Sequence, residues 1–359
     1  SNPDSLAGNT VYTLYKDRSG GLWIGTNNGL DRYDPQNDRF IHHQHQPTVS
    51  NSLSNNQVFT IHEDASGVLW IGTYGGGLNK YNRQQDRFAY YHKNPNNASS
   101  LSSNFIFPIL ADNEGYVWIG TLDGGLNRFD PITEQFTYFE HNPNDPTTIS
   151  NDSVISLYSD RQGVLWIGTT RGLNRFNPET NSFLSYQQVG IGDNISTRET
   201  IFAIREDTLG NLWIGTNRGL YLFNRDDQKF QQYEPEEGNP DFFSGYHVNA
   251  IIEDSSQNLW IGTFDDGLRR INLETNEITQ YTHNPENPSS LGSNAIMVIH
   301  EDKDGILWIG TYGGGLDRFE PGNNTFSHFT ENEGLPNNII YGILEDEMGH
   351  LWVSTNYGL

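Results

Sequence analysis

The hydrophobic and polar positions of this chain follow one short pattern that recurs along its whole length. In the clearest copy, an apolar stretch at 58–61 is followed by an Asp-x-x-Gly segment at 64–67 and by a second apolar stretch at 68–71. β-branched and aromatic residues favour strands. An aspartate that bonds its own backbone and a glycine that takes a positive φ favour a tight turn. The pattern therefore predicts two strands joined by a turn, named here strand a and strand b.

A tryptophan marks strand b in every copy and defines the period of the repeat. The tetrapeptide Trp-Ile-Gly-Thr begins at Trp23, Trp70, Trp118, Trp166, Trp213, Trp260 and Trp308, and an altered copy, Trp-Val-Ser-Thr, begins at Trp352. Successive tryptophans are separated by 47, 48, 48, 47, 47, 48 and 44 residues. Such regular spacing predicts tandem copies of one supersecondary unit.

Two further strands complete each unit. A Gly-Leu pair such as 77–78 follows the tetrapeptide and opens a third strand, c, through a hairpin turn. A turn that contains proline, as at 34–38, leads to a fourth strand, d, at the outer edge, because proline cannot pair in a central strand. Four strands in each repeat predict an all-β fold, a β-propeller built from four-stranded antiparallel blades.

The repeats are expected to form a single propeller domain over 1–359. Their approximate boundaries are 5–50, 51–98, 99–146, 147–194, 195–241, 242–288, 289–333 and a partial unit at 334–359. Because one sheet cannot bury both of its faces, each motif tryptophan is expected to pack between adjacent blades rather than in a binding site.

The eighth unit ends within strand c, which allows two arrangements of the blades. Eight blades with an incomplete last one are the favoured arrangement, and seven blades followed by the first hairpin of the next are the alternative. The sequence begins at Ser1 without a methionine or signal peptide and ends inside a repeat. We therefore expect it to be a fragment of a longer protein.

Composition and charge exclude several functional classes. Of the 359 residues, 34% are apolar and 13% aromatic, and 37 are glycine, a balance that suits short strands and many tight turns. No apolar run is long enough to span a membrane. The 45 acidic and 21 basic residues give a net charge of -24, which disfavours nucleic acid as a partner. The absence of cysteine excludes disulfides and fits an oxidising compartment such as a periplasm.

The repeat resembles the two-component regulator propeller repeat, whose pattern is similar to Asn-x-Val-x-x-Ile-x-Glu-Asp-x-x-Gly-x-Leu-Trp-Ile-Gly-Thr-x-x-Gly-Leu. Residues 56–78 and 294–316 follow it most closely. The resemblance implies a periplasmic sensor domain of a bacterial inner-membrane receptor. In such receptors a β-sandwich, a membrane helix and a kinase, hybrid kinase or diguanylate cyclase follow the propeller. It also implies that polysaccharide fragments are a plausible ligand class.

A ligand site is expected where the repeats differ from one another, because positions that fold the blade are alike in every copy. The two residues after each motif threonine, in the turn between strands b and c, vary strongly. Together with two positions at the start of strand a, they supply the predicted ligand-binding residues at a channel mouth: Asn27, Asn28, Tyr74, Asp123, Arg171, Arg218, Phe264, Asp265, Tyr312, Tyr357, Phe107 and His247. Aromatic rings beside amides and charges suit sugars.

Two irregular return loops, 187–200 with Arg198 and 234–246 with Phe242, Phe243 and Tyr246, are further candidates for function. Neither catalytic residues nor a cofactor are predicted. Paired carboxylates for sugar hydrolysis would have to come from Asp123, Asp265 and Asp266, which are more simply explained as turn residues. No metal site is predicted, since His42, His43 and His45 are expected at the surface.

These observations favour a ligand-sensing extracytoplasmic propeller that recognises an oligosaccharide or a related solute and is not an enzyme. The full-length receptor could form a homodimer, and it would meet the membrane only through segments outside this sequence. A scaffold for protein–protein interaction or dimerisation is the alternative. A propeller glycan lyase or hydrolase is the third and weakest hypothesis.

Overall fold

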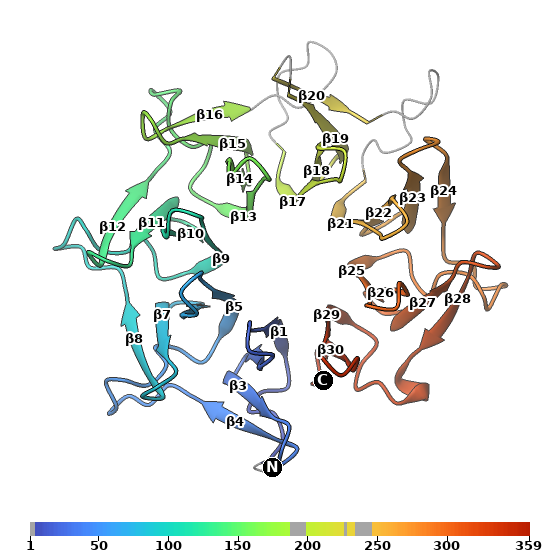
Figure 1. Cartoon of the computed structure of the whole chain (residues 1–359), viewed down its shortest axis with the longest axis horizontal. Coiled ribbons are helices and arrows are strands. Elements are labelled where there is room, and N and C mark those ends of the chain that lie inside the picture. Colours follow the sequence, from blue (N-terminus) through green and yellow to red (C-terminus); the bar gives the residue numbers. More distant parts are fainter. Residues whose placement is uncertain (1–3, 187–198, 226–227, 234–245) are drawn as a thin grey trace. The chain divides into compact units, whose positions relative to one another are not determined.

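The computed structural model describes residues 4–186, 199–225, 228–233 and 246–359. The chain is an all-β propeller of four-stranded antiparallel blades, as predicted. It has seven such blades, and each pairs its strands in sequence order (Figure 1). The eighth repeat adds only a two-stranded sheet. Its strand c is not formed, because after Thr355 only Gly358 takes part in a bridge. Complete blades therefore number seven, not eight.

The strands are short and correspond to strands a to d of each repeat. The first four blades comprise β1 (Val11–Lys16), β2 (Leu22–Thr26), β3 (Gly29–Asp34), β4 (Arg39–His43); β5 (Val58–Glu63), β6 (Leu69–Thr73), β7 (Gly77–Asn82), β8 (Arg87–Tyr91); β9 (Ile106–Ala111), β10 (Val117–Thr121), β11 (Leu126–Asp130), β12 (Gln135–Phe139); and β13 (Val154–Ser159), β14 (Leu165–Thr169), β15 (Gly172–Asn177), β16 (Ser182–Tyr186). The remaining sheets comprise β17 (Ile201–Glu206), β18 (Leu212–Thr216), β19 (Gly219–Asn224), β20 (Lys229–Gln232); β21 (Val248–Glu253), β22 (Asn258–Thr263), β23 (Leu268–Asn272), β24 (Ile278–Tyr281); β25 (Ile296–Glu301), β26 (Leu307–Thr311), β27 (Leu316–Glu320), β28 (Thr325–Phe329); and β29 (Ile340–Glu345), β30 (Leu351–Thr355).

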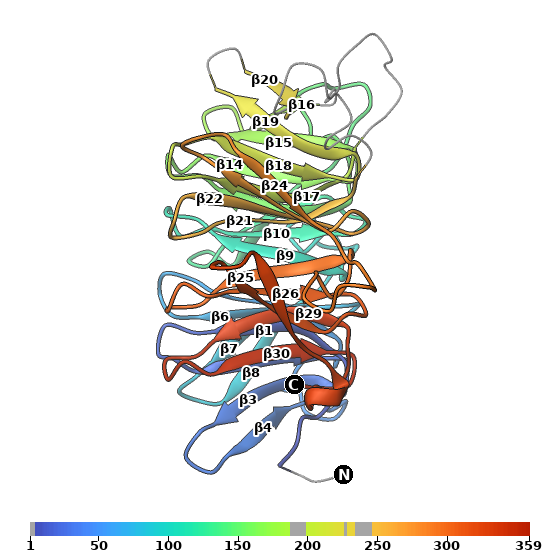
Figure 2. The same cartoon turned by 90° about the vertical axis from the view of Figure 1, so that its right-hand side faces the viewer.

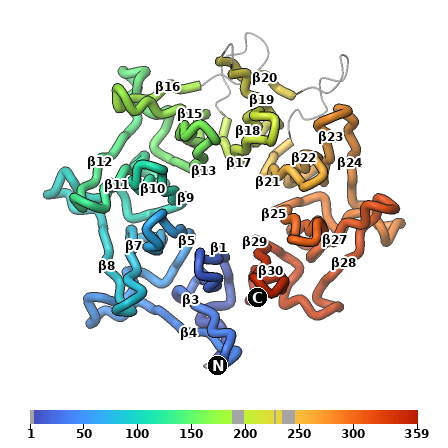
Figure 3. The backbone as a smooth tube through the Cα atoms, in the orientation of Figure 1, coloured from blue at the N-terminus to red at the C-terminus, as the bar shows by residue number. Residues whose placement is uncertain are grey.

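The chain divides into two compact units, one formed by residues 1–185 with Gly358 and the other by 186–357 with Leu359. In the first unit the inner strands β1, β5, β9 and β13 contact one another in that order, and in the second β17, β21, β25 and β29 do so. The chain leaves the outer strand of one blade and enters the inner strand of the next, as from β4 to β5 (Figure 3).

Helix is almost absent from the described residues. It is confined to the 3-10 turn Glu331–Glu333, the orange-red coil after β28 in Figure 2. Within the described residues, no helix has the length and apolar character needed to cross a membrane.

Each inner strand carries a β-bulge at its second residue. In β5, for example, Val58 pairs with Thr73 and Thr60 pairs with Gly72, so that Phe59 is left without a partner in the ladder. The same register shift occurs in the other inner strands. The residue before the bulge is fully buried, as Val58 is, whereas Phe59 is partly exposed. A bulge re-aims a side chain away from the regular alternation of the strand.

The motif tryptophans mainly occupy the core between blades, as predicted. Trp23 of the first blade packs with Leu53, Val58 and Tyr81 of the second, and Trp70, Trp118, Trp213 and Trp260 have the same relation to the blades that follow them. The prediction was too general for Trp308 and Trp352, which are only partly buried. Trp308 packs against the two-stranded sheet of β29 and β30, which has no outer strands to cover it.

An aspartate six residues earlier in the chain accepts a hydrogen bond from the indole N–H of each motif tryptophan. The indole Nε1 of Trp70 donates a hydrogen bond of 2.8 Å to Oδ2 of Asp64, and the other carboxylate oxygen accepts from the backbone nitrogens of Ser66 and Val68. The remaining repeats form the same indole–carboxylate pair at 2.7–3.0 Å. The Asp-x-x-Gly turn therefore also fixes the orientation of the core tryptophan.

Candidate functional site

The predicted residues of the first unit lie where expected, in the turns between strands b and c. Asn27, Asn28, Tyr74, Asp123 and Arg171 are all exposed. Tyr74 retains 38% of its accessible surface although it is a large aromatic residue. Hairpin geometry places these side chains beyond the end of strand b and therefore outside the core.

Five aromatic side chains come together at this end of the first unit. The ring centroid of Tyr74 lies 5.4 Å from that of Phe59 and 4.7 Å from that of Phe105. Phe59 in turn lies 4.4 Å from Tyr12 and 5.6 Å from Phe107. We call Tyr12, Phe59, Tyr74, Phe105 and Phe107 the first aromatic cluster. It connects three successive blades and offers partly exposed ring surface.

The predicted polar residues of the first unit are not equally available for ligand binding, because some of them already bond to the protein. The amide of Asn28 donates to the backbone oxygen of Ala7 at 2.7 Å, and Oδ1 of Asn27 accepts from the backbone nitrogen of Thr10 at 3.4 Å. Both asparagines therefore hold the N-terminal segment in place. The carboxylate of Asp123 accepts a short hydrogen bond from the hydroxyl of Ser103. Structural roles thus account for part of the predicted set.

The second unit contains a comparable group of rings. Phe264 and Tyr312, which are 40% and 46% exposed, have ring centroids 5.8 Å apart. The ring of His247 lies 6.1 Å from Phe264 and 4.2 Å from Phe202. We call Phe202, His247, Phe264 and Tyr312 the second aromatic cluster. Its members come from three successive blades.

Charged and polar groups surround the second cluster. Asp265 adjoins Phe264 and is exposed. Burial lowers the pKa of His247, and the negative charge of Asp265 opposes that shift to a smaller extent. The Nε2 atom of His247 is buried and has no hydrogen-bond partner among the described residues. Arg218 and Tyr357 are exposed in the turns of their own repeats, and nothing in the described residues joins them to the cluster.

Sequence reasoning missed Tyr12 and Phe59, which contribute to the first aromatic cluster from inner strands. The signal was present, because Tyr12, Phe59, Phe107 and Phe202 all occupy the second position of strand a. The prediction used this position at Phe107 but not at Tyr12 or Phe59, because the bulge that exposes it is not evident from composition. Of the irregular loops, residues 187–198 and 234–245 lie outside the described residues, and with them Arg198, Phe242 and Phe243.

Several side chains that a hydrolase or a metal site could use are engaged as structural partners. Asp266 forms an ion pair with Arg269, whose side chain is almost fully buried beneath the ring of Tyr246. His42 bonds Asp31 at 2.6 Å, and His45 bonds the backbone oxygen of Leu53 at 2.7 Å. No group of three potential metal-binding side chains occurs in the described part of the chain.

The architecture is similar to that of solved propellers. The Dos1 propeller matches with a TM-score of 0.65 at 11% identity, over 97% of this chain and 90% of its own. PorZ, a surface component of the type-IX secretion system of Porphyromonas gingivalis, gives a TM-score of 0.63 at 19% identity, over 100% of this chain and 55% of its own. At these identities the likeness concerns the fold alone.

A third solved structure is the extracellular domain assigned to a hybrid two-component system of B. thetaiotaomicron. It is 22% identical over 99% of this chain and 57% of its own, with a TM-score of 0.47, which is too low to support an argument. The chain spans little more than half the length of this domain and of PorZ. No curated protein matches it in sequence.

The family model described as "Two component regulator propeller" matches every repeat. The matched segments cover more than half of the chain: 5–28, 52–75, 100–123, 148–171, 196–218, 243–265, 290–313 and 334–357. Each segment extends from the approach to strand a, through the indole–carboxylate turn, to the b–c turn that holds the predicted ligand-binding residues. The chain therefore belongs to the two-component regulator propeller family.

Proposed function

We propose that this propeller is the ligand-sensing extracytoplasmic domain of a bacterial signal-transduction receptor. Within it, the exposed residues of the b–c turns and the two aromatic clusters bind an oligosaccharide or a related solute. Membership of the two-component regulator propeller family supports the sensor role. The binding role rests on one observation, which is the concentration of partly exposed rings at the b–c ends of the blades in both units.

The chemistry of these surfaces suits a sugar better than an apolar solute. Rings such as Tyr74 and Phe264 can pack against the apolar face of a pyranose, while neighbouring polar groups bond its hydroxyls. Asp123, Asp265 and Arg171 supply such groups at exposed positions of the same turns. In the full-length receptor, ligand binding would act by favouring one state of a membrane-coupled dimer.

The test is a calorimetric screen of plant, algal and host glycan fragments, followed by alanine variants of Tyr74 and Phe264. Each variant is expected to weaken binding of an identified ligand by about 5- to 150-fold, which corresponds to a lost contact of about 1–3 kcal/mol. The melting temperature should hardly change, because both residues are exposed.

Tyr138→Ala is the matched control. Tyr138 is 41% exposed, much like Tyr74, but it lies on the outer strand β12, where it pairs with Asn127 of β11, and it belongs to neither aromatic cluster. The Tyr138→Ala variant should leave both ligand binding and protein stability unchanged. Equal binding by wild type and the Tyr74 and Phe264 variants would refute this placement of the site, and turnover of the glycan would replace the sensor proposal with an enzymatic one.

A further inference from the structure

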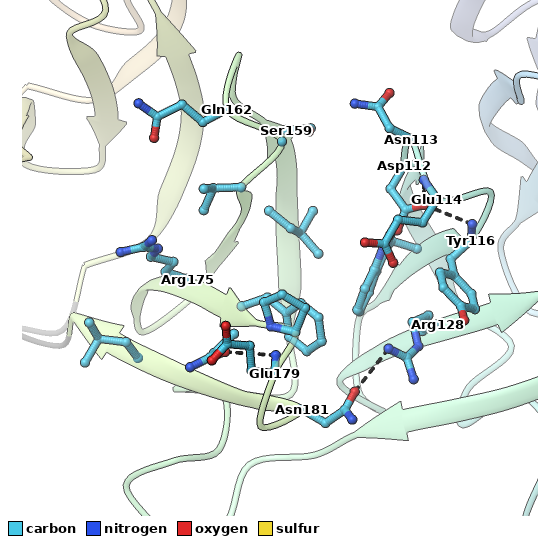
Figure 4. Close-up of a pocket in the computed structure, with 18 residues that line it drawn as sticks. Asp112, Asn113, Glu114, Tyr116, Arg128, Ser159, Gln162, Arg175, Glu179 and Asn181 are labelled. Carbon is cyan, nitrogen blue, oxygen red and sulfur yellow. Dashed lines mark hydrogen bonds between the residues drawn. The ribbon is translucent and has the colours of Figure 1, made fainter.

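A groove lies between the third and fourth blades, within the first compact unit (Figure 4). Its volume is about 980 Å³, at the upper end of the range for small-molecule sites. The a–b turn from Asp112 to Tyr116 forms one wall and the strand end at Ser159 begins the other, with the c–d turn 177–181 between them. In an antiparallel blade these turns lie opposite the b–c turns, so the groove is separate from the aromatic clusters.

The corresponding space between the first and second blades is filled by two long side chains. Glu63 accepts a 2.7 Å hydrogen bond from the backbone nitrogen of Arg18 in the first blade. Arg83 donates at 2.7 Å both to Asp17 of the first blade and to Glu63 of the second. A carboxylate and a guanidinium therefore close this gap and connect the two blades.

The glutamate bridge is a regular element of the repeat. In the second unit the equivalent glutamates accept from backbone nitrogens of the preceding blade at 2.6–2.8 Å: Glu253 from Thr208, Glu301 from Ser255 and Glu345 from Lys303. The third blade has Ala111 at this position, but there the backbone nitrogen of Ala111 donates to the imidazole of His62 at 3.0 Å. A direct link to the preceding blade is thus retained.

The fourth blade carries neither of the two side chains that bridge the first and second blades. Ser159 stands where the second, fifth, sixth, seventh and eighth repeats have glutamate, and Pro178 stands where the second and fifth have arginine. The first, third and seventh repeats also have proline at that position. A serine hydroxyl ends two bonds short of a glutamate carboxylate, and a proline side chain has no hydrogen-bonding group. The glutamate contact that most repeats can make is therefore given up here, and local departures of this kind are expected at functional sites.

The side chains that line the groove combine apolar surface with hydrogen-bonding groups. Tyr116 occupies a position where the second and fourth blades have Val68 and Val164. The guanidinium of Arg128 lies 4.8 Å from the centre of the Tyr116 ring and donates to Oδ1 of Asn181 at 3.1 Å. The ring and the guanidinium therefore hold each other in place. Exposed polar side chains continue the lining: Asn113, Glu114, Gln162 and Glu179.

The lining of the groove carries one more negative than positive charge. Its carboxylates are those of Asp112, Glu114 and Glu179, and its guanidinium groups are those of Arg128 and Arg175. Both oxygens of Asp112 are already engaged, one by the backbone nitrogens of Glu114 and Tyr116 and the other by the indole of Trp118. A strongly anionic ligand would face repulsion from the carboxylates, whereas an uncharged ligand rich in hydroxyls would find donors and acceptors.

We propose that this groove is a second binding site, for a neutral sugar or short neutral oligosaccharide. Apolar patches of the sugar pack on Tyr116 and Pro178, and its hydroxyls bond the amides, carboxylates and guanidinium groups around them. The site depends on the short side chains of Ser159 and Pro178 and not on the aromatic clusters.

The decisive variant introduces the two bridging side chains of the second blade, as Ser159→Glu combined with Pro178→Arg. The new glutamate and arginine should bridge the blades as Glu63 and Arg83 do, so the fold is kept and the groove is filled. Cellotriose, laminaritriose, maltotriose and xylotriose serve as neutral probes, with trigalacturonate as the anionic comparison, measured by calorimetry and saturation-transfer NMR. At least one neutral probe should bind wild type below about 10 mM, and the double variant should weaken it at least 10-fold.

Tyr116→Val, which introduces the residue of the second and fourth blades, should weaken the same probe about 3- to 10-fold. Tyr74→Ala and Phe264→Ala should not affect it, which separates this site from the proposed sensor surface. The inference is overturned if no neutral probe binds wild type, if the double variant binds as well as wild type, or if trigalacturonate binds more tightly than every neutral probe. A probe lost only in the Tyr74 and Phe264 variants would support the sensor surface and not the groove.

Discussion

At the scale of single residues, the aspartate of the repeat has two roles that the sequence pattern presents as one. Asp64 caps the a–b turn through one carboxylate oxygen and holds the indole of Trp70 through the other. Trp70 is fully buried, so its N–H would otherwise be a buried donor without a partner, which is costly. Turn formation and core packing are therefore coupled in one side chain.

Removal of this carboxylate should destabilise the protein in a pH-dependent way. Burial, the largest effect, raises the pKa of Asp64, but the hydrogen bonds from Ser66, Trp70 and Val68 together outweigh it and lower the pKa. In Asp346 of the last repeat the same balance lowers the pKa to about 2. A folded-state pKa below the unfolded value of about 3.9 means that the stabilisation is complete above about pH 4 and is lost as the pH falls.

Asp64→Ala is accordingly expected to cost about 1–3 kcal/mol at pH 7, and the difference from wild type should shrink as the pH falls from about 4 towards 2. Urea unfolding followed by tryptophan fluorescence at several pH values measures both effects. Asp304→Ala, at an exposed position of another a–b turn, is the control and should stay within about 0.5 kcal/mol of wild type. A pH-independent deficit for Asp64→Ala would contradict the assignment.

At the scale of elements, the blade is shaped by two irregularities at the C-terminal end of strand b. The bulge in strand a exposes Phe59 beside Tyr74. The b–c hairpin requires glycine where the chain turns back towards the outer strand. Gly77 has a φ of +82°, and a Cβ atom placed there would lie 2.2 Å from the backbone oxygen of Tyr91.

Two glycine-to-alanine changes can separate backbone strain from steric exclusion in these turns. Gly163 of an a–b turn has a φ of +78°, similar to that of Gly77, but a Cβ atom there would meet nothing within 4 Å. Gly163→Ala should therefore cost about 1–2 kcal/mol, the penalty of the left-handed conformation alone. Gly77→Ala should cost at least twice as much, because β7 must also move away from β8. Thermal and urea unfolding of both variants provides the comparison, and equal costs would show that the contact with Tyr91 relaxes freely.

At the scale of the whole molecule, net charge is the property that the local patterns do not reveal. With 45 acidic and 21 basic residues, the folded chain repels itself and polyanions alike. Ion pairs such as Arg83 with Asp17, between two blades, and Arg225 with Glu206, within one blade, leave the acidic excess unneutralised.

Salt should therefore stabilise the protein. Raising sodium chloride from about 10 to 200 mM shortens the Debye length from about 30 to under 10 Å and should raise the melting temperature, while heparin and DNA columns should not retain the protein at about 150 mM salt. Scanning calorimetry in guanidinium-free buffers that differ only in sodium chloride concentration measures the change in melting temperature. A melting temperature that falls with salt, or tight heparin binding, would mean that local basic surface outweighs the net charge.

Short-range chemistry explains what the sequence alone determined: a propeller of four-stranded blades numbering seven to eight, buried tryptophans in most repeats, and exposed side chains in the b–c turns. Turn residues and strand periodicity act within a few positions, so each copy of the repeat carries this information. The sequence favoured eight blades with an incomplete last one, but the eighth repeat forms only two strands, and the complete blades number seven.

Contacts between blades were decided only by the tertiary structure. The bridge from Glu63 to Arg18 joins residues 45 positions apart, and the absence of its counterpart at Ser159 has a consequence only where the third and fourth blades face each other. The first aromatic cluster likewise needs a bulge to bring Tyr12 and Phe59 beside Tyr74. Such features depend on how neighbouring repeats pack, and no single repeat of the sequence specifies them.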